Sequence, residues 1–282
     1  MPSYDTKGPI TANIHVEVGV ARISAGDRTD TVVEIHPRTA GDKDDQRAAD
    51  ETKVDFSDGT LTIRTPKARG LFSARGSVLV EVSLPQGSRL LGTLEMGDIT
   101  CKGTLGECEV RTSAGDIRLD QAGPVRLKTQ HGDVQLDTAT GDVDVTTGSG
   151  EVRVRTIGGD ADIKNSNGNT WLDDVAGDLR LKVANGNITV GRAQGSVTSK
   201  SSNGNVRIEE VARGTVELQT KAGNLEVGIR QGTAAWLDIN SQSGTVYSTL
   251  GSAEGPTEGA ETVKVHARTS LGDITIQRAH GA

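Results

Sequence analysis

The sequence predicts an all-β protein: a parallel β-solenoid with two-strand coils of about 18 residues, preceded by a small β-rich N-terminal capping module. A glycine-led phrase recurs about every nine residues between residues 97 and 231. Counted from this glycine, positions two and four are apolar and position three is usually polar, which is the alternation of a strand with one buried face. The 282 residues include 36 glycines but only 2% aromatic residues, which suits thin coils better than a wide core.

The repeats are of two kinds, as GDLRLKVAN from Gly177 and GNVRIEEVAR from Gly204 illustrate. Polar-ended repeats finish in small polar residues before the next glycine, whereas apolar-ended repeats carry a small apolar residue two positions before it. Two kinds of corner indicate two strands per coil. Glycine suits these corners because it reaches positive φ angles without a Cβ penalty.

The predicted core consists of the two apolar columns that the repeats place above one another. Position two runs from Ile99 to Leu225 and position four from Val110 to Val227. Cys101 and Cys108 fall in these inward columns, so we expect them to be buried thiols that pack as small apolar side chains. A narrow solenoid of this kind needs no large aromatic side chain in its core.

The pattern divides the chain into a β-rich N-terminal cap (1–95), the solenoid repeats (96–231), and irregular C-terminal coils with a cap (232–282). In the first part we expect short strands in ITANIHVEVG, ARISAG and TVVEIHP, one or two helical turns in DKDDQRAADE, and a hairpin around Asp58 and Gly59. KARGLFSARG is predicted to be a loop, and SVLVEVSLP an edge strand ended by Pro85.

After Gln231 the period breaks. GTAAWLDINSQSGTVYS is predicted to form two irregular strands with Trp236 pointing inward as a plug, and GSAEGPTEGAE a flexible loop. TVKVHARTSLGDITIQRA returns to the repeat pattern as a last hairpin-like coil. Both ends are therefore expected to be capped, which argues against a fibre that grows by end-to-end stacking.

The combination of an opening module PITANIHVEVGVARISAGDRTDTVVEIHP, a strand ending in LPQGS, and repeats such as SAGDIRL and GPVRLKT resembles the bacterial putative-adhesin β-repeat domain of the toastrack superfamily. The resemblance covers nearly the whole chain. It implies a protein of stacked β-strand repeats. Members of the superfamily are often attached to membrane helices and occur in cell-envelope stress systems, so the resemblance implies a possible role there.

The formal charge of −7 argues against binding to nucleic acid or to an anionic membrane. The segment MPSYDTKGPITANIHVEVGV has no basic stretch followed by an apolar one, and no apolar run is long enough to span a bilayer. We therefore expect a cytoplasmic protein that does not insert directly into the membrane.

Two polar columns flank the repeat glycine. The residue after it in apolar-ended repeats resembles the acidic edge of calcium-binding nonapeptide rolls. However, the GGxGxD motif of those rolls is absent, and Asn replaces the carboxylate in half of the coils. We therefore predict no metal or cofactor. The residue before it includes Asn167, Asn185 and Asn203, which we interpret as a structural hydrogen-bonded ladder. The first column is Asp98, Asp116, Asp133, Glu151, Asn169, Asn187, Asn205 and Asn224.

Position five is basic in most polar-ended repeats and leans acidic in the apolar-ended repeats, which predicts one positive and one negative edge. Alternating charge keeps strands soluble, but a linear groove for an anionic polymer is also conceivable, and the sequence leaves that choice open. The basic column is Arg111, Lys128, Lys164, Lys182 and Lys200, and the acidic one Asp120, Asp137, Asp173 and Glu209.

The sequence contains no CxxC, catalytic triad order, phosphate loop or zinc spacing, and its five histidines share no spacing, so we predict no enzyme activity. Three hypotheses remain: a non-enzymatic scaffold or protein-interaction module, a self-assembling or adhesin-like structural protein, and a carbohydrate-acting β-helix enzyme, which would need insertions that the repeats lack. For the first, Trp171 is the predicted anchor of a protein-binding face. The candidate binding residues occupy position three: Arg118, Arg153, Trp171, Arg180 and Arg207. The partner, the oligomeric state and the handedness of the coil are left open.

Overall fold

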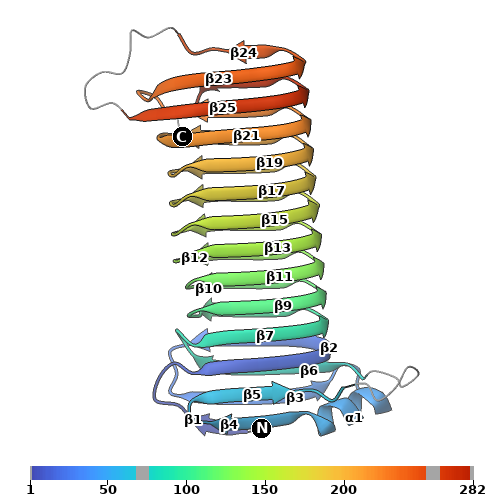
Figure 1. Ribbon diagram of the computed structural model, residues 1–282. Helices are drawn as coiled ribbons and strands as arrows, with labels where there is room; N and C mark the ends of the chain where they lie inside the picture. Colours follow the sequence, from blue (N-terminus) through green and yellow to red (C-terminus); the bar gives the residue numbers. More distant parts are fainter. Residues whose placement is uncertain (1, 68–75, 252–260, 280–282) are drawn as a thin grey trace. The chain divides into compact units, whose positions relative to one another are not determined.

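The computed structural model describes residues 2–67, 76–251 and 261–279, so most of the two predicted loops lies outside the described residues. The chain forms two compact units, Met1–Thr140 and Gly141–Ala282. In both units parallel strands stack coil upon coil with two strands per coil, which confirms the predicted solenoid (Figure 1). The division at residues 95 and 231 stays a prediction.

The strands of each coil belong to two layers, which we call sheet A and sheet B. The N-terminal unit contains β1 (Ser3–Asp5), β2 (Thr11–Gly26), β3 (Asp30–Pro37), α1 (Lys43–Glu51), β4 (Lys53–Ser57), β5 (Thr60–Arg64), β6 (Val78–Pro85), β7 (Arg89–Met96), β8 (Ile99–Thr104), β9 (Cys108–Ala114), β10 (Ile117–Ala122), β11 (Val125–His131) and β12 (Val134–Ala139). In this unit sheet A runs in the order β1, β3, β6, β2, β8, β10, β12, and sheet B in the order β4, β5, β2, β7, β9, β11.

The strand β2 belongs to both sheets. The two predicted strands ITANIHVEVG and ARISAG are its two halves, joined at Gly19, whose φ is 154°. The first half pairs with β5 and β7 in sheet B, and the second half with β6 and β8 in sheet A. The prediction that SVLVEVSLP forms an edge strand is wrong, because β6 pairs with β2 on one side and β3 on the other.

The predicted hairpin and helix are both present. Strands β4 and β5 pair antiparallel around Asp58 (φ 48°) and Gly59 (φ 71°), the positive angles that a tight hairpin turn needs. Helix α1 begins after Asp42, whose carboxylate accepts hydrogen bonds from the backbone N–H groups of Asp44 (2.9 Å) and Asp45 (3.0 Å). These elements were predictable because their signals are local.

The C-terminal unit also has two layers of strands, named in the same way. It contains β13 (Val143–Ser149), β14 (Val152–Ile157), β15 (Ala161–Asn167), β16 (Thr170–Val175), β17 (Leu179–Asn185), β18 (Ile188–Ala193), β19 (Val197–Asn203), β20 (Val206–Val211), β21 (Gly214–Ala222), β22 (Leu225–Ile229), β23 (Ala234–Ser243), β24 (Val246–Ser248), β25 (Thr262–Leu271) and β26 (Ile274–Arg278). Here sheet A runs in the order β14, β16, β18, β20, β22, β26, β24, and sheet B in the order β13, β15, β17, β19, β21, β25, β23.

The order of the last coils differs from the order of the chain. Strand β25 lies between β21 and β23, and β26 pairs with both β22 and β24, so the final coil of the sequence is the penultimate coil in space (Figure 1). The prediction of an inward Trp236 is wrong. Trp236 pairs with the outward residue Lys264 and is 64% exposed, whereas its neighbour Leu237 continues the column of buried Val265.

Burial confirms the predicted core, because the residues at positions two and four are buried from Ile99 and Val110 to Leu225 and Val227. Full burial of a Val, Leu or Ile side chain contributes roughly 1.5 to 3 kcal/mol, most of it offset by chain entropy. The small apolar residues of the apolar-ended corners are buried as well: Ala122, Ala139, Ile157, Val175, Ala193 and Val211.

Position six of the polar-ended repeats holds buried polar side chains that tie neighbouring coils together. The hydroxyl of Thr269 donates to the carbonyl oxygen of Gly223 (3.0 Å), and the side-chain amide of Asn165 donates to that of Gly150 (3.0 Å). Each bond satisfies a carbonyl at a glycine corner of the preceding coil. Buried Thr269 and Asn165 are therefore compatible with the apolar core, because their donors have acceptors.

Thr170 offers a test of this balance. It is fully buried at position two of β16, and its hydroxyl has no hydrogen-bond partner among the described residues. Replacing Thr170 by Val is expected to stabilise the protein by about 1 kcal/mol and to raise the melting temperature by about 2–4 °C, because an unpaired buried hydroxyl is removed. The matched control is Thr269→Val, which removes a paired hydroxyl and should lower the melting temperature. Equal shifts in the two variants would contradict this account.

Candidate binding surfaces

The outward residues of sheet A in the C-terminal unit form one straight column at position three. The pairing register places Trp171 between Arg153 and Thr189, and Arg207 between Thr189 and Glu226. At the far end of the column Tyr247, 56% exposed, lies beside Thr275. Neighbouring members of such a column are separated by about 4.8 Å, the spacing of paired strands. We call these residues the sheet A column: Arg153, Trp171, Thr189, Arg207, Glu226, Thr275 and Tyr247.

Trp171 is half-buried beneath a neighbouring cation. The guanidinium carbon of Arg153 lies 4.5 Å from the centre of the indole ring, a cation–π contact. The Nη2 atom of Arg153 also lies 3.0 Å from the Oε2 atom of Glu151. The indole is therefore held in one orientation on an outward face, with a charged group stacked on it.

The other predicted binding residues are distributed over both faces. Arg207 shares the sheet A column and pairs with Glu209 (3.5 Å) and Glu226 (3.7 Å). Arg180 lies on β17 in sheet B, so it does not share a face with Trp171. Arg118 lies on β10 in sheet A of the N-terminal unit, where its Nη2 atom is 2.7 Å from the Oδ2 atom of Asp116.

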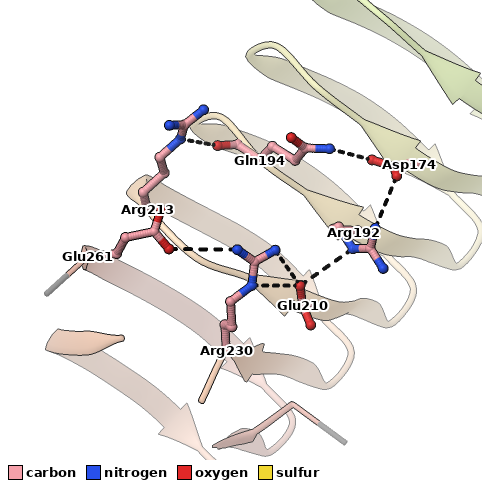
Figure 2. Close-up of polar contacts among 7 residues, drawn as sticks. All are labelled: Asp174, Arg192, Gln194, Glu210, Arg213, Arg230 and Glu261. Atoms are coloured by element: carbon pink, nitrogen blue, oxygen red, sulfur yellow. Dashed lines mark hydrogen bonds and ion pairs between the residues drawn. The ribbon is translucent and has the colours of Figure 1, made fainter. Parts of the chain in front are cut away.

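A ladder of alternating charges runs beside the sheet A column, with Asp174, Arg192 and Glu210 at position six of the apolar-ended repeats and Arg230 and Glu261 extending it (Figure 2). Arg192 lies between Asp174 (3.4 Å) and Glu210 (3.5 Å), and Arg230 between Glu210 (2.8 Å) and Glu261 (3.7 Å). The hydrogen bond to Glu210 raises the pKa of Arg230 above its usual value. Sequence reasoning missed this ladder, although opposite charges 18 residues apart at Asp174, Arg192 and Glu210 were a readable signal.

The ion-pair ladder borders a shallow groove of about 410 Å³ on sheet A. Gly191 and Gly228 lie in its floor, where a side chain would collide with backbone oxygens of the preceding strand. The polar residues around it include Asp174, Arg192 and Glu210, whose charged groups already have partners in the ladder. The lining therefore combines the paired charges of the ladder with an acidic excess, because it holds five carboxylates and two arginines.

Sheet B carries the predicted basic ladder. Lys164, Lys182 and Lys200 are in direct register on β15, β17 and β19. The Nζ atom of Lys164 is 3.2 Å from the Oδ1 atom of Asp162, but no carboxylate contacts Lys182 or Lys200 within the described part of the chain. Repulsion between charges about 4.8 Å apart in water is only about 0.9 kcal/mol, so the ladder needs no bound anion. Lys128 occupies the same position on β11, beside Arg111.

The Asn column before the corner glycine is the predicted structural ladder. The side-chain amide of Asn185 donates to the Oδ1 atom of Asn167, and that of Asn203 to the Oδ1 atom of Asn185, both at 2.9 Å. The contacts link equivalent residues of consecutive coils on sheet B. The column thus stabilises stacking, as its regular spacing in the sequence predicted.

The column after the corner glycine forms a second ladder, in which side-chain oxygens accept hydrogen bonds from the backbone of the next coil. The Oδ1 atom of Asn187 accepts from the N–H of Asn205 (3.0 Å), and that of Asp98 from the N–H of Asp116 (2.9 Å). Asp and Asn both present such an oxygen, which explains why they replace one another in this column. That folding requires no metal stays a prediction.

The N-terminal unit has an open groove of about 1000 Å³ lined by charged side chains of both signs, among them His15, Glu17, Arg64 and Glu95. Burial and the neighbouring charges of Arg64 and Lys67 lower the pKa of His15, so its imidazole is neutral at pH 7. No hydrogen bond joins His15 to a carboxylate in the described ranges.

A second cluster in this unit combines Glu34, His36 and Glu81, whose potential ligand atoms lie within 4.8 Å of one another. His36 contacts Glu34 (3.3 Å), and Arg22 contacts Glu81 (3.3 Å), so each carboxylate already has a protein partner. Glu34 and Glu81 face each other across antiparallel strands.

Both cysteines are free and buried, as predicted. Burial raises the pKa of the Cys108 thiol to about 12 and that of Cys101 well above its usual value. The thiolate, which is the reactive form, is therefore scarce at neutral pH. The two thiols act as core side chains rather than as nucleophiles.

Fold and surface together define a β-solenoid with hydrogen-bonded polar ladders and regular outward columns. The Toastrack DUF4097 family model matches residues 13–277, and the chain belongs to this family. No similar sequence was found among curated proteins. Among the described residues, no helix has both the length and the apolar character needed to cross a membrane.

Solved structures that this chain matches include proteins described as putative adhesins. A putative adhesin (BF0245) from Bacteroides fragilis has 11% identity and a TM-score of 0.36, with 98% of this chain and 95% of that chain covered. A putative adhesin from Parabacteroides distasonis has 12% identity and a TM-score of 0.34, with coverages of 98% and 95%. A putative cell adhesion protein from Clostridium sporogenes has 12% identity and a TM-score of 0.22, with 98% of each chain covered. The family assignment rests on the family model.

Proposed function

We propose that this protein is a non-enzymatic scaffold that binds a protein partner through the sheet A column of its C-terminal unit. The observation that carries the proposal is the oriented Trp171, stacked against Arg153 on an outward face. Tryptophan and arginine are the residue types that most often dominate the free energy of protein–protein binding. Sequence reasoning had already selected these two residues.

The surroundings of Trp171 favour protein recognition over binding of a small molecule. The neighbouring ladder of Asp174, Arg192 and Glu210 compensates its own charges, so a partner would not have to neutralise a strong field of one sign. The hydrogen-bonded coils keep the column straight before binding. Little conformational entropy is then lost when a partner docks.

Two alternatives are less well supported. A carbohydrate-acting enzyme would need paired carboxylates poised across a substrate, whereas Glu209 and Glu210 beside the sheet A groove are engaged by Arg192, Arg207 and Arg230. A self-assembling or adhesin-like structural role is favoured by one observation, the exposed apolar side chains of the last coil.

We place this activity in the bacterial cytoplasm, in connection with a cell-envelope stress system. The cytoplasmic setting is supported by the two neighbouring free thiols, which a reducing compartment keeps unpaired. The stress connection is supported by the resemblance of the repeats to the toastrack superfamily. Fractionation of host cells with and without envelope stress checks both parts of this proposal.

The binding face is tested with the double variant Trp171→Ala and Arg153→Glu. We expect it to fold normally and to lose, in a pull-down from the host, proteins that the wild type retains, with affinity reduced at least about 30-fold. The matched control is Arg180→Glu, which makes the same charge change on sheet B and should retain them. Retention of every co-purifying protein by the folded double variant would show that this column is not the binding face.

A further inference from the structure

The exposed large apolar side chains of this protein are concentrated at one place. The described residues include six of them, of which only Met96 lies outside the last two coils. The other five are Trp236 (64% exposed), Leu237 (39%), Val246 (44%), Tyr247 (56%) and Leu271 (59%), on β23, β24 and β25. Monomeric soluble proteins rarely leave such a concentration of apolar surface uncovered.

Two of these side chains belong to the core columns. Leu237 is in register with Val265, and Val246 with Ile274, and both partners are 0% exposed. The same columns that are buried in every earlier coil are therefore open to solvent in the coil formed by β23 and β24. The core ends without a cover among the described residues.

The backbone of β23 is paired with β25 on one side and with no described strand on the other. The backbone N–H of Ala234 donates to the carbonyl oxygen of Glu261. Backbone N–H and C=O groups alternate in direction along a strand, so those of Ala234 and of every second residue through Asn240 point toward β25. The backbone N–H and C=O groups of Ala235, Leu237 and Ile239 consequently point away from β25, to the side of β23 that has no paired strand among the described residues. These are also the residues in register with the buried Val263, Val265 and Ala267, so free hydrogen-bonding groups and exposed core side chains belong to the same residues.

We propose that the protein forms a two-fold symmetric dimer through this edge, with β23 of one copy pairing antiparallel with β23 of a second copy. This dimer does not require a partner bound at Trp171, although Tyr247 belongs both to this edge and to the sheet A column. In an antiparallel ladder, residues that exchange hydrogen bonds face each other and share a face of the sheet. In this dimer Leu237 of one copy lies opposite Leu237 of the other, and Ala235 lies opposite Ile239. This register pairs the free backbone groups and also brings the two apolar cores into contact.

The length of β23 favours a second β23 as its pairing strand, and the charge of Asp238 favours the register centred on Leu237. Strand β23 has ten residues, whereas the outermost strands of the N-terminal unit, β1 and β4, have three and five, so neither matches its edge in a head-to-tail arrangement. Shifting the register by one residue on each strand would place Asp238 opposite Asp238, which is repulsive. The register centred on Leu237 instead places Asp238 opposite Trp236. A two-fold contact also closes on itself, so it gives a dimer and not a fibre.

Light scattering coupled to size-exclusion chromatography tests the proposal. We expect the wild type to have twice its chain mass of 29.5 kDa at concentrations of about 1 to 100 µM. Leu237→Lys should weaken self-association at least ~100-fold, because it buries an unpaired charge in the joined core. Asn240→Lys is the matched control. It introduces the same lysine side chain at an outward position of β23 whose N–H points toward β25. This variant should remain dimeric.

Amide hydrogen exchange on the wild type gives a second measurement that does not depend on a variant folding. Peptides covering β23 should exchange more slowly at high protein concentration than after dilution, whereas peptides covering β17 should not change. A wild type that stays monomeric would overturn the proposal and indicate another occupant of the edge. So would a folded Leu237→Lys variant that remains dimeric, or exchange in β23 that is independent of concentration.

Discussion

Replacing Val152 by Asp is expected to unfold the C-terminal unit. Val152 is 0% exposed at position two of β14, in register with buried Thr170 on β16. A carboxylate there would be an unpaired charge in an apolar column, which costs at least about 3–5 kcal/mol. Because a domain of this size is stable by only about 5–15 kcal/mol, such a loss removes a large share of a margin of about 10 kcal/mol and all of one of about 5 kcal/mol. Thermal unfolding followed by circular dichroism measures the effect.

The matched control is Lys182→Asp, which introduces the same side chain at an outward position of the same unit. Lys182 is exposed between Lys164 and Lys200, so an aspartate there gains two cationic neighbours. We expect its melting temperature to stay within a few degrees of the wild type. If Val152→Asp also melted like the wild type, position two would not be an inward column, and the assignment of the core would fail.

Replacing Gly186 by Ala is expected to be the second most damaging change. Gly186 has a φ of +142°, and a Cβ atom there would lie 2.1 Å from the carbonyl oxygen of Gly168 in the preceding coil. That oxygen belongs to the backbone, so the two coils would have to move apart. Their separation would weaken the hydrogen bond from the N–H of Gly168 to Asn185, now 2.9 Å. We estimate a loss of about 3–5 kcal/mol in the free energy of unfolding.

The control for this change is Gly232→Ala. Gly232 also has a positive φ, +82°, but a Cβ atom there meets nothing within 4 Å. Its replacement carries only the conformational cost of the backbone angle, about 1 kcal/mol. Denaturant unfolding of the two variants separates that cost from the collision between coils. Similar losses in both would show that tight stacking at the corners contributes little to stability.

The candidate surfaces were only partly readable from the sequence. Trp171 and Arg153 could be selected because both stand at outward positions of a regular pattern, and 18-residue spacing places them side by side. Arg180 was grouped with them although it stands on a polar-ended repeat and so on the other sheet. The ladder of Asp174, Arg192 and Glu210 is hard to recognise in the sequence, because the charge at this position changes sign from one coil to the next.

The sequence by itself determined the inward columns, the glycine corners, the hairpin at Asp58 and Gly59, and helix α1. Each depends on residues close together in the chain or on a spacing that repeats, so the preference is expressed wherever the segment lies. Only the tertiary structure decided that β2 serves two sheets, that β25 and β26 insert before the last coil, and that Trp236 points outward. Any coil of this pattern can stack on any other, because all present the same apolar columns and the same backbone ladder. The order of coils at the ends therefore depends on which edges are free when the chain closes, which no local pattern encodes.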